Sequence, residues 1–554
     1  MKKIIAILLS AAMILSLAGC SKEEETTKKK KKTKKTTADT EDTTEDPTDD
    51  PTDDPTEDPT TKPTDDPTTD PTDDPTTDTS AVPVDTSSDS TSGNPDPGTN
   101  PVQSLHTIIS TECAGYGNFN QDEYHMDYVK IWIEYPEFTS LSVDTLEEKV
   151  YSYFSPLETA MIEEYDSAVA DYTNGTMPEE NSLAAYTDIF RDDTYIFSYV
   201  VDIPARFSKD DSGFETHSFF TETGEEIALS DVVKDFDAVL KAAEEYHAVI
   251  YGDSVPLDQA FVDSFKAGTA PFTLTYDGIC LFSEYSYIKV PLSAISDAVD
   301  LKYFGNTPDS YFLNLDSKME LYWDIDGDGQ EDSLSVEGKT DSNDMLEEVI
   351  IHHNGQDFTI GTDVWGEFHS YDDNYVMVTD DGIYMYLLLG IDEAQEYVGF
   401  SYENGAWTGI GVFENGESFY GQAYDPSCVY MSRGFDLIGS HYFYSDYYFE
   451  GNDGKPELNV IVFNSTAFLL EATQDIPCYE MDKNLNVTGE GTIPKGACVN
   501  VAMYDPEYNQ ILLEVSFADY TQNYYVSADV SASSPYTISG IPINEAFDGI
   551  FYGG

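Results

Sequence analysis

The stretch that decides the fold of the first folded region begins with FFTETGEEIALSDVV (219–233) and ends with FTLTYDGICLF (272–282). In the first phrase, a strand-like run ends at a glycine turn. Between the phrases, the patterns predict amphipathic helices over 236–250 and 257–266. The second phrase predicts a β-hairpin, because Asp277-Gly278 is a turn sequence between two apolar runs. Strands, helices and a hairpin in this order favour an α+β layout.

The residues before this stretch extend the same layout. VKIWIEY (129–135) alternates like a strand. Asp144 and Glu147 resemble a capping box, so a long helix is expected to start there. Pro156 predicts a kink in that helix or the start of a second one. We therefore expect residues 105–308 to form one α+β domain, with helices on one face of an antiparallel sheet.

The phrases at 219–233 and 272–282, together with YIKVPLSAI (287–295) and the strand at 129–135, resemble a known family. It is the extracellular domain of RsiV-type anti-sigma factors, the lysozyme sensors of Gram-positive bacteria. The same domain type precedes the catalytic domain of some peptidoglycan deacetylases. The resemblance implies binding of a protein or a wall polymer rather than turnover, with lysozyme, a basic protein, as one ligand. The segment FSEYSYIKV (282–290) is shorter here than the corresponding loop of the family.

The segment DIDGDGQED (324–332) predicts a calcium-binding loop. Its acidic residues stand at positions 1, 3, 5 and 9, with glycine at position 6 to allow a sharp turn. Position 12 is Ser335 rather than glutamate, and strand-like runs flank the loop, which favours a β-hairpin over a helix–loop–helix hand. We expect one Ca²⁺ with a structural role, and the predicted ligands are Asp324, Asp326, Asp328, Asp332 and the backbone carbonyl of Gln330. The alternative is an ordinary Asp/Gly turn in an acid-rich chain.

Residues 309–462 predict a β-rich domain. Turn sequences recur there beside short apolar or aromatic runs. These turns are Asn354-Gly355, Asp381-Gly382, Asn404-Gly405, Asn415-Gly416 and Asp453-Gly454. The pattern is typical of an antiparallel sandwich, a meander or a partial propeller.

Residues 463–554 predict a second all-β domain. The segment CYEMDKNLNVTGEGTIPKGACVNVAMYD (478–505) alternates short β runs with glycine and proline turns and resembles a bacterial SH3-like domain. That resemblance implies a small barrel that binds wall peptides or acts as a spacer. The predicted fold class is therefore multidomain, an α+β domain followed by all-β domains, of which the last is SH3-like.

The N-terminus predicts a lipoprotein. An apolar run (4–17) follows the positively charged Lys2 and Lys3 and is too short to span a bilayer. We therefore expect residues 1–19 to be a signal peptide. The sequence LAGC resembles a lipobox, which implies a lipid on the thiol of Cys20; the alternative is an ordinary signal peptide. A Lys block and Pro-Thr-Asp repeats make residues 20–104 a disordered stalk. We expect the lipid to hold the chain at the outer face of the cytoplasmic membrane, with the folded part in or beyond the wall of a Gram-positive bacterium.

The cysteines that follow Cys20 are sparse and odd in number, with no C-x-x-C spacing: Cys113, Cys280, Cys428, Cys478 and Cys498. This set is neither a disulfide scaffold nor a zinc site. Cys478 and Cys498 lie in one predicted β unit and are a candidate disulfide, with two free thiols as the alternative.

Charge narrows the choice of partner. The chain has 27 Lys and Arg against 105 Asp and Glu, a net charge of −78. Residues 101–554 hold 16 of the basic and 82 of the acidic residues, so the acidity belongs to the folded part. Such a surface repels phosphate, which excludes nucleic acid as a partner. Lysozyme or another basic protein, or peptidoglycan, remains as a candidate partner.

The sequence contains no G-x-S-x-G, H-E-x-x-H, P-loop or dinucleotide fingerprint. We therefore expect a non-enzymatic cell-surface lipoprotein that binds a protein or cell-wall ligand outside the membrane. Two alternatives stay open. One is a wall-modifying hydrolase that uses a carboxylate site, and the other is a structural surface spacer.

Overall fold

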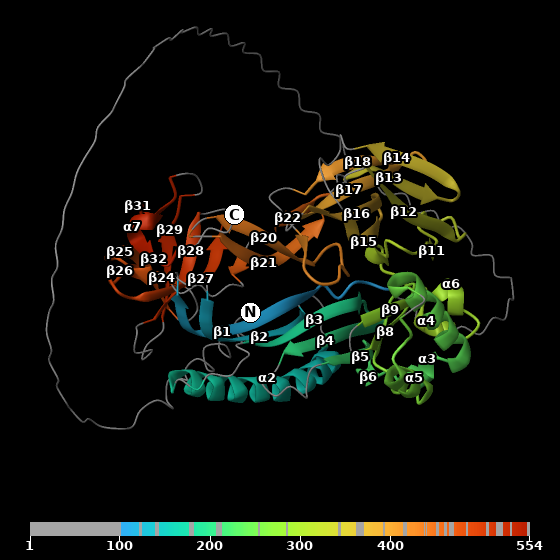
Figure 1. Cartoon of the computed structure of the whole chain (residues 1–554), viewed down its shortest axis with the longest axis horizontal. Helices are drawn as coiled ribbons and strands as arrows, with labels where there is room; N and C mark the ends of the chain where they lie inside the picture. Colours follow the sequence, from blue (N-terminus) through green and yellow to red (C-terminus); the bar gives the residue numbers. More distant parts are fainter. Residues whose placement is uncertain are drawn as a thin grey trace, which may run out of the picture. The chain divides into compact units, whose positions relative to one another are not determined.

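The computed structural model describes residues 101–550 apart from a set of short segments. The segments left out are 121–124, 139–142, 175, 177–181, 206–212, 253–254, 284–285, 342–344, 362–369, 392–393, 414–417, 437, 439, 450–453, 459–461, 465–469, 483–485, 506–508, 517–523 and 532–534. The predicted signal peptide, Cys20 and residues 21–100 of the predicted stalk lie outside the described residues, whereas residues 101–104, predicted as the end of the stalk, are described, and Ser104 forms a β-bridge with Asp193. Among the described residues, no helix is long and apolar enough to cross a membrane. The described part is mostly β-sheet with a few helices, arranged in several sheets (Figure 1).

The first sheet has six strands in chain order: β1 (Thr107–Asn120), β2 (His125–Phe138), β3 (Ser182–Asp192), β4 (Ile196–Ala205), β5 (Gly213–Phe220) and β6 (Glu225–Glu226). The expectation of an antiparallel sheet needs one correction, because β2 and β3 pair in parallel. The reason is the long helix α2 (Asp144–Thr173), which lies between β2 and β3 in the chain and returns it to the same end of the sheet. The strand β1 was not predicted.

Helix α2 is a single helix with Pro156 inside it, so neither a second helix nor a break occurs at the proline. Its buried residues on both sides of the proline share one core with the six-stranded sheet: Leu146, Val150, Phe154, Leu157, Met161, Tyr165 and Ala168. Packing of this face on the sheet offsets the hydrogen bond that a proline removes. Figure 1 shows the helix along one face of the sheet.

The predicted helices and hairpin of 236–282 are confirmed. The two predicted helices are α4 (Phe236–Tyr251) and α5 (Gln259–Lys266). The short helices α3 (Leu229–Val232) and α6 (Leu292–Ile295) and the 3₁₀ helix η1 (Leu301–Tyr303) were not predicted. The hairpin extends to three antiparallel strands, β7 (Phe272–Leu274), β8 (Gly278–Ser283) and β9 (Ser286–Pro291). The side chains of Asp235 and Asp258 cap α4 and α5 by accepting hydrogen bonds from backbone N–H groups. The helices and the small sheet bury one common core.

Two sheets make up the middle of the chain. The five-stranded sheet contains β10 (Tyr311–Leu315), β15 (Ser370–Thr379), β16 (Gly382–Ile391), β17 (Ala394–Glu403) and β18 (Ala406–Val412). The four-stranded sheet contains β11 (Leu321–Trp323), β12 (Asp332–Thr340), β13 (Leu346–His353) and β14 (Gln356–Gly361). Residues of both sheets form one apolar core, as in a sandwich. The predicted turns at 354–355, 381–382 and 404–405 each join two neighbouring strands, whereas Asn415-Gly416 and Asp453 lie outside the described residues.

The last large sheet joins the C-terminal strands to earlier ones. Its strands are β19 (Ser418–Phe419), β20 (Val429–Asp436), β21 (Ser440–Phe449), β22 (Pro456–Leu458), β23 (Val462–Asn464), β24 (Leu470–Ala472), β25 (Ile476–Met481), β26 (Val487–Ile493), β27 (Cys498–Asp505), β28 (Gln510–Ser516), β29 (Tyr524–Asp529) and β32 (Phe547–Asp548). A two-stranded ribbon, β30 (Thr537–Ile538) and β31 (Ile541–Pro542), and the short helix α7 (Ile543–Ala546) complete the chain. Among the described strands this sheet does not close into a barrel. β19 to β22 lie outside the predicted SH3-like unit but share its sheet.

A fully buried ion pair ties the first sheet to the segment after the helices. Arg191 and Asp193 are both inaccessible to solvent, and Arg191 Nε donates to Asp193 Oδ2 at 2.6 Å. The guanidinium also donates to the carbonyl oxygens of Tyr303 (2.7 Å) and Asn306 (3.2 Å) and lies 5.0 Å from the ring centroid of Tyr276. Breaking such a pair leaves an uncompensated buried charge, which is strongly destabilising.

We predict that Arg191→Met lowers the free energy of unfolding by about 3–5 kcal/mol, because Asp193 loses its cation in a site shielded from solvent. The measurement is urea unfolding of the full chain followed by far-UV circular dichroism. Lys241→Met is the matched control, since Lys241 pairs with Glu245 on the exposed face of α4 and such pairs contribute less than about 1 kcal/mol. Equal unfolding midpoints for the two variants would contradict the structural role of the buried pair.

Candidate functional site

The predicted calcium loop joins two antiparallel strands. Residues 324–331 connect β11 to β12, and Trp323 pairs with Asp332 at the base of the loop. The expected hairpin setting is therefore confirmed. The two strands hold the first and last acidic residues of the loop next to each other.

Three of the predicted ligands converge. One carboxylate oxygen each of Asp324, Asp326 and Asp332 lies within 4.8 Å of the other two. Oxygens that share one Ca²⁺ at 2.3–2.6 Å are at most about 5 Å apart, so this spacing fits a single ion. Among the described residues, no other group of three acidic, histidine or cysteine side chains meets this criterion.

Backbone N–H groups fold the loop around these carboxylates. Gly329 N donates to Asp324 Oδ2 at 2.9 Å, Asp328 N to Asp326 Oδ1 at 3.1 Å, and Ile325 N to Asp332 Oδ2 at 2.9 Å. Gly329 has a φ of +83°, in the left-handed region that favours glycine. The turn that the sequence places at position 6 is thus formed.

One carboxylate oxygen in this group has no donor. Asp324 Oδ1 is inaccessible to solvent and has no hydrogen-bond partner among the described residues. A shielded carboxylate oxygen without a donor is costly, because it loses water and gains nothing in return. A cation bound among the three carboxylates would compensate it.

Asp328 and Gln330 stand apart from the three convergent residues. Asp328 Oδ1 accepts from the backbone N of Gln330 at 2.7 Å, and its Oδ2 accepts from the Gln330 side-chain amide at 3.1 Å. The structure therefore brings together three of the four predicted side-chain ligands. The roles of Asp328 and of the Gln330 carbonyl as ligands stay predictions.

A second layer of residues holds Asp332. This side chain is 5 % exposed, and its Oδ1 accepts from Asn354 Nδ2 and lies 3.6 Å from His353 Nε2. Trp407 Nε1 donates to His353 Nδ1 at 3.2 Å, so the proton of a neutral His353 is on Nε2 and faces Asp332. Such support from β13 and β18 fixes a ligand in position before an ion binds.

The two cysteines offered as a candidate disulfide are free thiols in the structure. Cys478 lies on β25 and Cys498 on β27, and β28 and β29 stand between these strands in the sheet. Their separation in the sheet explains why no bridge forms. Cys20 lies outside the described residues.

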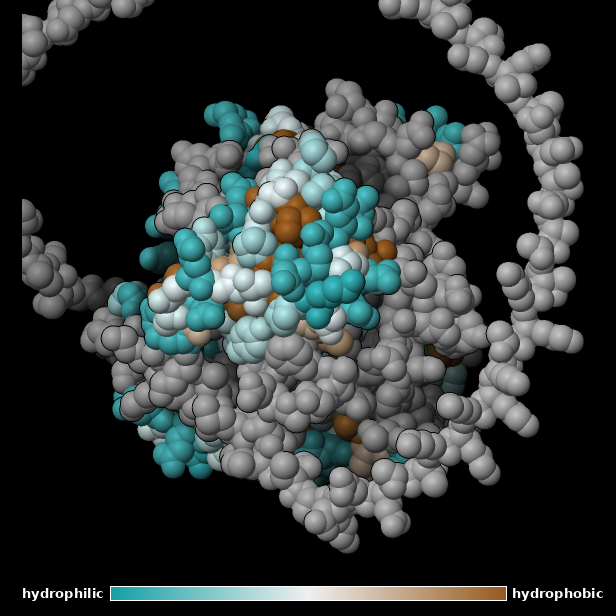
Figure 2. Space-filling view, turned by 90° about the vertical axis from the view of Figure 1, so that its left-hand side faces the viewer, coloured by the Kyte–Doolittle hydropathy of each residue, from teal (hydrophilic) through white to brown (hydrophobic). Residues whose placement is uncertain are grey.

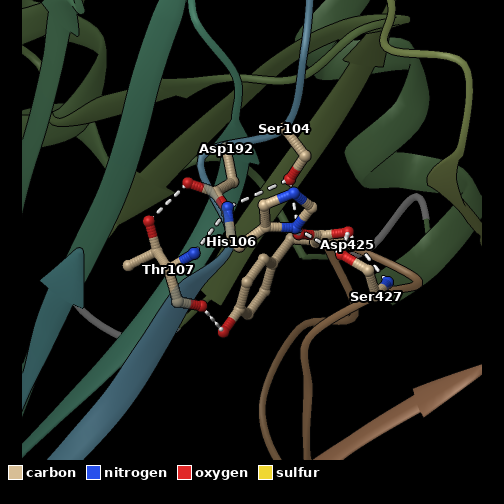
Figure 3. Close-up of polar contacts among 7 residues, drawn as sticks. Ser104, His106, Thr107, Asp192, Asp425 and Ser427 are labelled. Atoms are coloured by element: carbon tan, nitrogen blue, oxygen red, sulfur yellow. Dashed lines mark hydrogen bonds and ion pairs between the residues drawn. The ribbon is translucent and has the colours of Figure 1, made fainter. Parts of the chain in front are cut away.

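Sequence reasoning missed a polar cluster at the start of the described chain (Figure 3). His106 Nδ1 lies 3.0 Å from Asp425 Oδ2, and the hydroxyls of Ser104 and Ser427 also bond to this pair. Asp425 is 2 % exposed, whereas the His106 side chain is 43 % exposed. The residues come from two segments that lie far apart in the chain, and neither segment has a periodic pattern that signals a site.

The geometry of this cluster does not suit nucleophilic catalysis. A Ser-His-Asp relay needs the hydroxyl and the carboxylate on opposite nitrogens of the imidazole. Here Ser427 Oγ and Asp425 Oδ2 both contact Nδ1 of His106, and the Ser427 hydroxyl donates to Asp425 Oδ1 at 2.8 Å. The cluster joins two segments and is not arranged to pass a proton from serine to histidine.

Comparison with known proteins found no matching family model and no similar protein among curated sequences. Two solved structures of the DUF3298 family are similar to part of the chain. One, from Bacteroides fragilis, is 11% identical and matches 37% of this chain and 96% of its own length, with a TM-score of 0.25. The other, from Pseudomonas aeruginosa, is 14% identical and matches 37% of this chain and 100% of its own, with a TM-score of 0.24.

We predict that Ca²⁺ raises the thermal midpoint of the full chain. With a dissociation constant of about 0.1 mM, within the range of extracellular sites, 10 mM Ca²⁺ adds about 2.7 kcal/mol of stability. An Asp324→Asn/Asp326→Asn variant should lose this shift, because two of the three convergent carboxylates are gone. The measurement is differential scanning calorimetry at constant ionic strength.

The matched control is Asp380→Asn/Asp381→Asn, which removes the same charge from the exposed turn between β15 and β16. It should keep the full Ca²⁺ shift. An equal loss in both variants would show that Ca²⁺ acts only by screening the negative charge of the chain.

Proposed function

We propose that this chain is a non-enzymatic lipoprotein of the bacterial cell surface, whose folded part is stabilised by Ca²⁺ and binds a protein or cell-wall ligand. The observation that carries the calcium part is the convergence of Asp324, Asp326 and Asp332 around a shielded oxygen without a donor. Extracellular Ca²⁺ sites, with dissociation constants of about 0.1–1 mM, are filled at the Ca²⁺ concentrations found outside cells, which agrees with the predicted export.

The charge of the folded part supports a cationic ligand. Residues 101–554 hold 82 acidic and 16 basic residues, and some of the basic ones are buried in ion pairs, as Arg191 and Lys289 are. On the face that carries β25 and β26, hydrophilic residues predominate and hydrophobic ones form small separate spots (Figure 2). The excess of acidic over basic residues, rather than this hydropathy, attracts basic proteins at long range. Lysozyme-like wall hydrolases are basic proteins and are therefore our first choice of ligand.

Binding without turnover is the activity that we propose. The Ser-His-Asp cluster lacks the geometry of a nucleophilic site, and the convergent carboxylates of the loop accept backbone hydrogen bonds, as ion ligands do. We further propose that the first sheet with its helices is an RsiV-type binding domain and that residues 463–554 act as an SH3-like wall-binding unit or spacer.

We predict saturable binding of the full chain to lysozyme at 0.15 M NaCl that survives at 0.5 M NaCl, because a built interface is screened less than long-range attraction. The measurement is isothermal titration calorimetry, with an unrelated protein of equal positive charge as the control. Salt-sensitive binding to both proteins would reduce the effect to net charge. Release of muropeptides from peptidoglycan by the chain would instead favour a hydrolase.

A further inference from the structure

The first residues of the described chain are tied to the turn between β3 and β4. Thr194 N donates to the carbonyl of Gln103 at 2.8 Å, and Gln103 N donates to Thr194 Oγ1 at 3.0 Å. Ser104 forms a β-bridge with Asp193. The predicted stalk leads directly into this segment, so residues 103–107 are where a tethered chain would enter the fold.

The same segment is also held by the loop before β20 (Figure 3). Asp425 accepts the hydroxyl of Ser104 and pairs with His106, and Tyr424 Oη donates to the carbonyl of Thr107 at 2.8 Å. His106 has a φ of +53°, in the left-handed region that is uncommon for residues other than glycine. The contacts to Asp425 hold the residue there. We call residues 104–107 with 424–427 the entry joint.

Among the described residues, three buried aspartates in and beside the entry joint face two cations. Asp192, Asp193 and Asp425 are at most 2 % exposed, and their carboxyl groups interact with one another. The cations that face them are Arg191, which is paired with Asp193, and His106, which is paired with Asp425. Tyrosines also face the cluster. Tyr424 lies in the joint, Tyr195 lies next to Arg191 and Asp193, and burial and the acidic groups hold the pKa of Tyr276 well above the ordinary value.

Charge balance therefore requires two protons. With His106 protonated and Asp192 neutral, two carboxylates face two cations. Burial, together with the nearby Asp425, raises the pKa of Asp192 to about 7, although the N–H (3.0 Å) and hydroxyl (2.6 Å) of Thr107 donate to it and oppose the shift. The hydrogen bond to Asp425 raises the pKa of His106 above its ordinary value, against the effect of partial burial.

We propose that the entry joint is a proton-dependent latch, closed when His106 and Asp192 both carry a proton and opened by the loss of those protons. Opening would free residues 104–107 from the 424–427 loop and expose Asp192 to water. The inference is independent of the proposed ligand and of calcium. It makes the attachment of the tether to the fold sensitive to the pH at the cell surface.

The direction of the effect follows from the two pKa shifts. In the open segment Asp192 would titrate near 4, so between about pH 4 and 7 the closed state binds one more proton than the open state and weakens as pH rises. In the open segment His106 would titrate near 6.5, so its contribution is complete below that pH and is lost as pH rises through its raised value. Both groups therefore close the latch in mild acid.

The experiment is hydrogen–deuterium exchange of the full chain at pH 5 to 8.5, corrected for the intrinsic exchange rate and read on peptides that cover 104–107 and 424–428. We expect the opening equilibrium to increase by about tenfold per pH unit from pH 5 to 7 and to level off above the pKa of His106. Asp192→Asn should flatten the curve below pH 7, and His106→Gln should remove the step above pH 6.5.

A matched control separates the latch from general titration of the sheet. Burial also raises the pKa of Glu134 to about 7, although Trp132 and Thr187 donate hydrogen bonds to it, and this residue lies on β2 outside the joint. Glu134→Gln should leave the exchange of 104–107 as pH-dependent as in the wild type. Exchange that does not change with pH in the wild type would overturn the proposal, as would the wild-type pH dependence in Asp192→Asn. Asn is close in shape to the protonated acid, so this variant should fold even if His106→Gln does not.

Discussion

The fold depends on two buried cationic side chains, Arg191 and Lys289, in a chain with far fewer basic than acidic residues. Burying an ion costs several kcal/mol, which is recovered only by a close partner and further hydrogen bonds. Arg191 has Asp193, and Lys289 has Asp277 at 2.6 Å. Each also donates to backbone carbonyls of the segment 303–314, which leads from the helices to β10. The two cations therefore hold the segment that leads from the α+β region to the β-rich region against β3 and β9.

Local patterns predicted what local forces determine. The helices α4 and α5, the hairpin at 272–282 and the turns of the middle sheets follow from periodicity, caps and Asn-Gly or Asp-Gly pairs, whose effect is limited to a few residues. The calcium loop belongs to the same class, because its acidic residues lie close together in the chain and the flanking strands bring the ends together. Pro156 shows the limit of such patterns, since packing on the sheet outweighed its local preference to break α2.

Long-range pairing was beyond the reach of these patterns. The parallel contact between β2 and β3 depends on α2 as a crossover, and β19 to β22 belong to the C-terminal sheet although the sequence groups them with the middle strands. The polar cluster is the clearest case. Nothing near His106 in the sequence points to Asp425, and a single histidine in an irregular segment is usually a surface residue. Only the fold shows that these two side chains meet.

We propose that the negative charge of clustered carboxylates is neutralised by a divalent ion at the calcium loop and by protons at the entry joint. A surface with 82 acidic residues repels itself, and wherever the fold brings carboxylates together the excess charge must be neutralised or solvated. At the calcium loop Asp326 is exposed and Asp324 is partly exposed, so that a divalent ion could reach them, although Asp332 is buried. Asp192 and Asp425 are almost fully buried, and there a proton is favoured over an ion because a proton adds no volume and needs no coordination shell. We therefore propose that access from solvent decides whether an acidic cluster is neutralised by calcium or by protons.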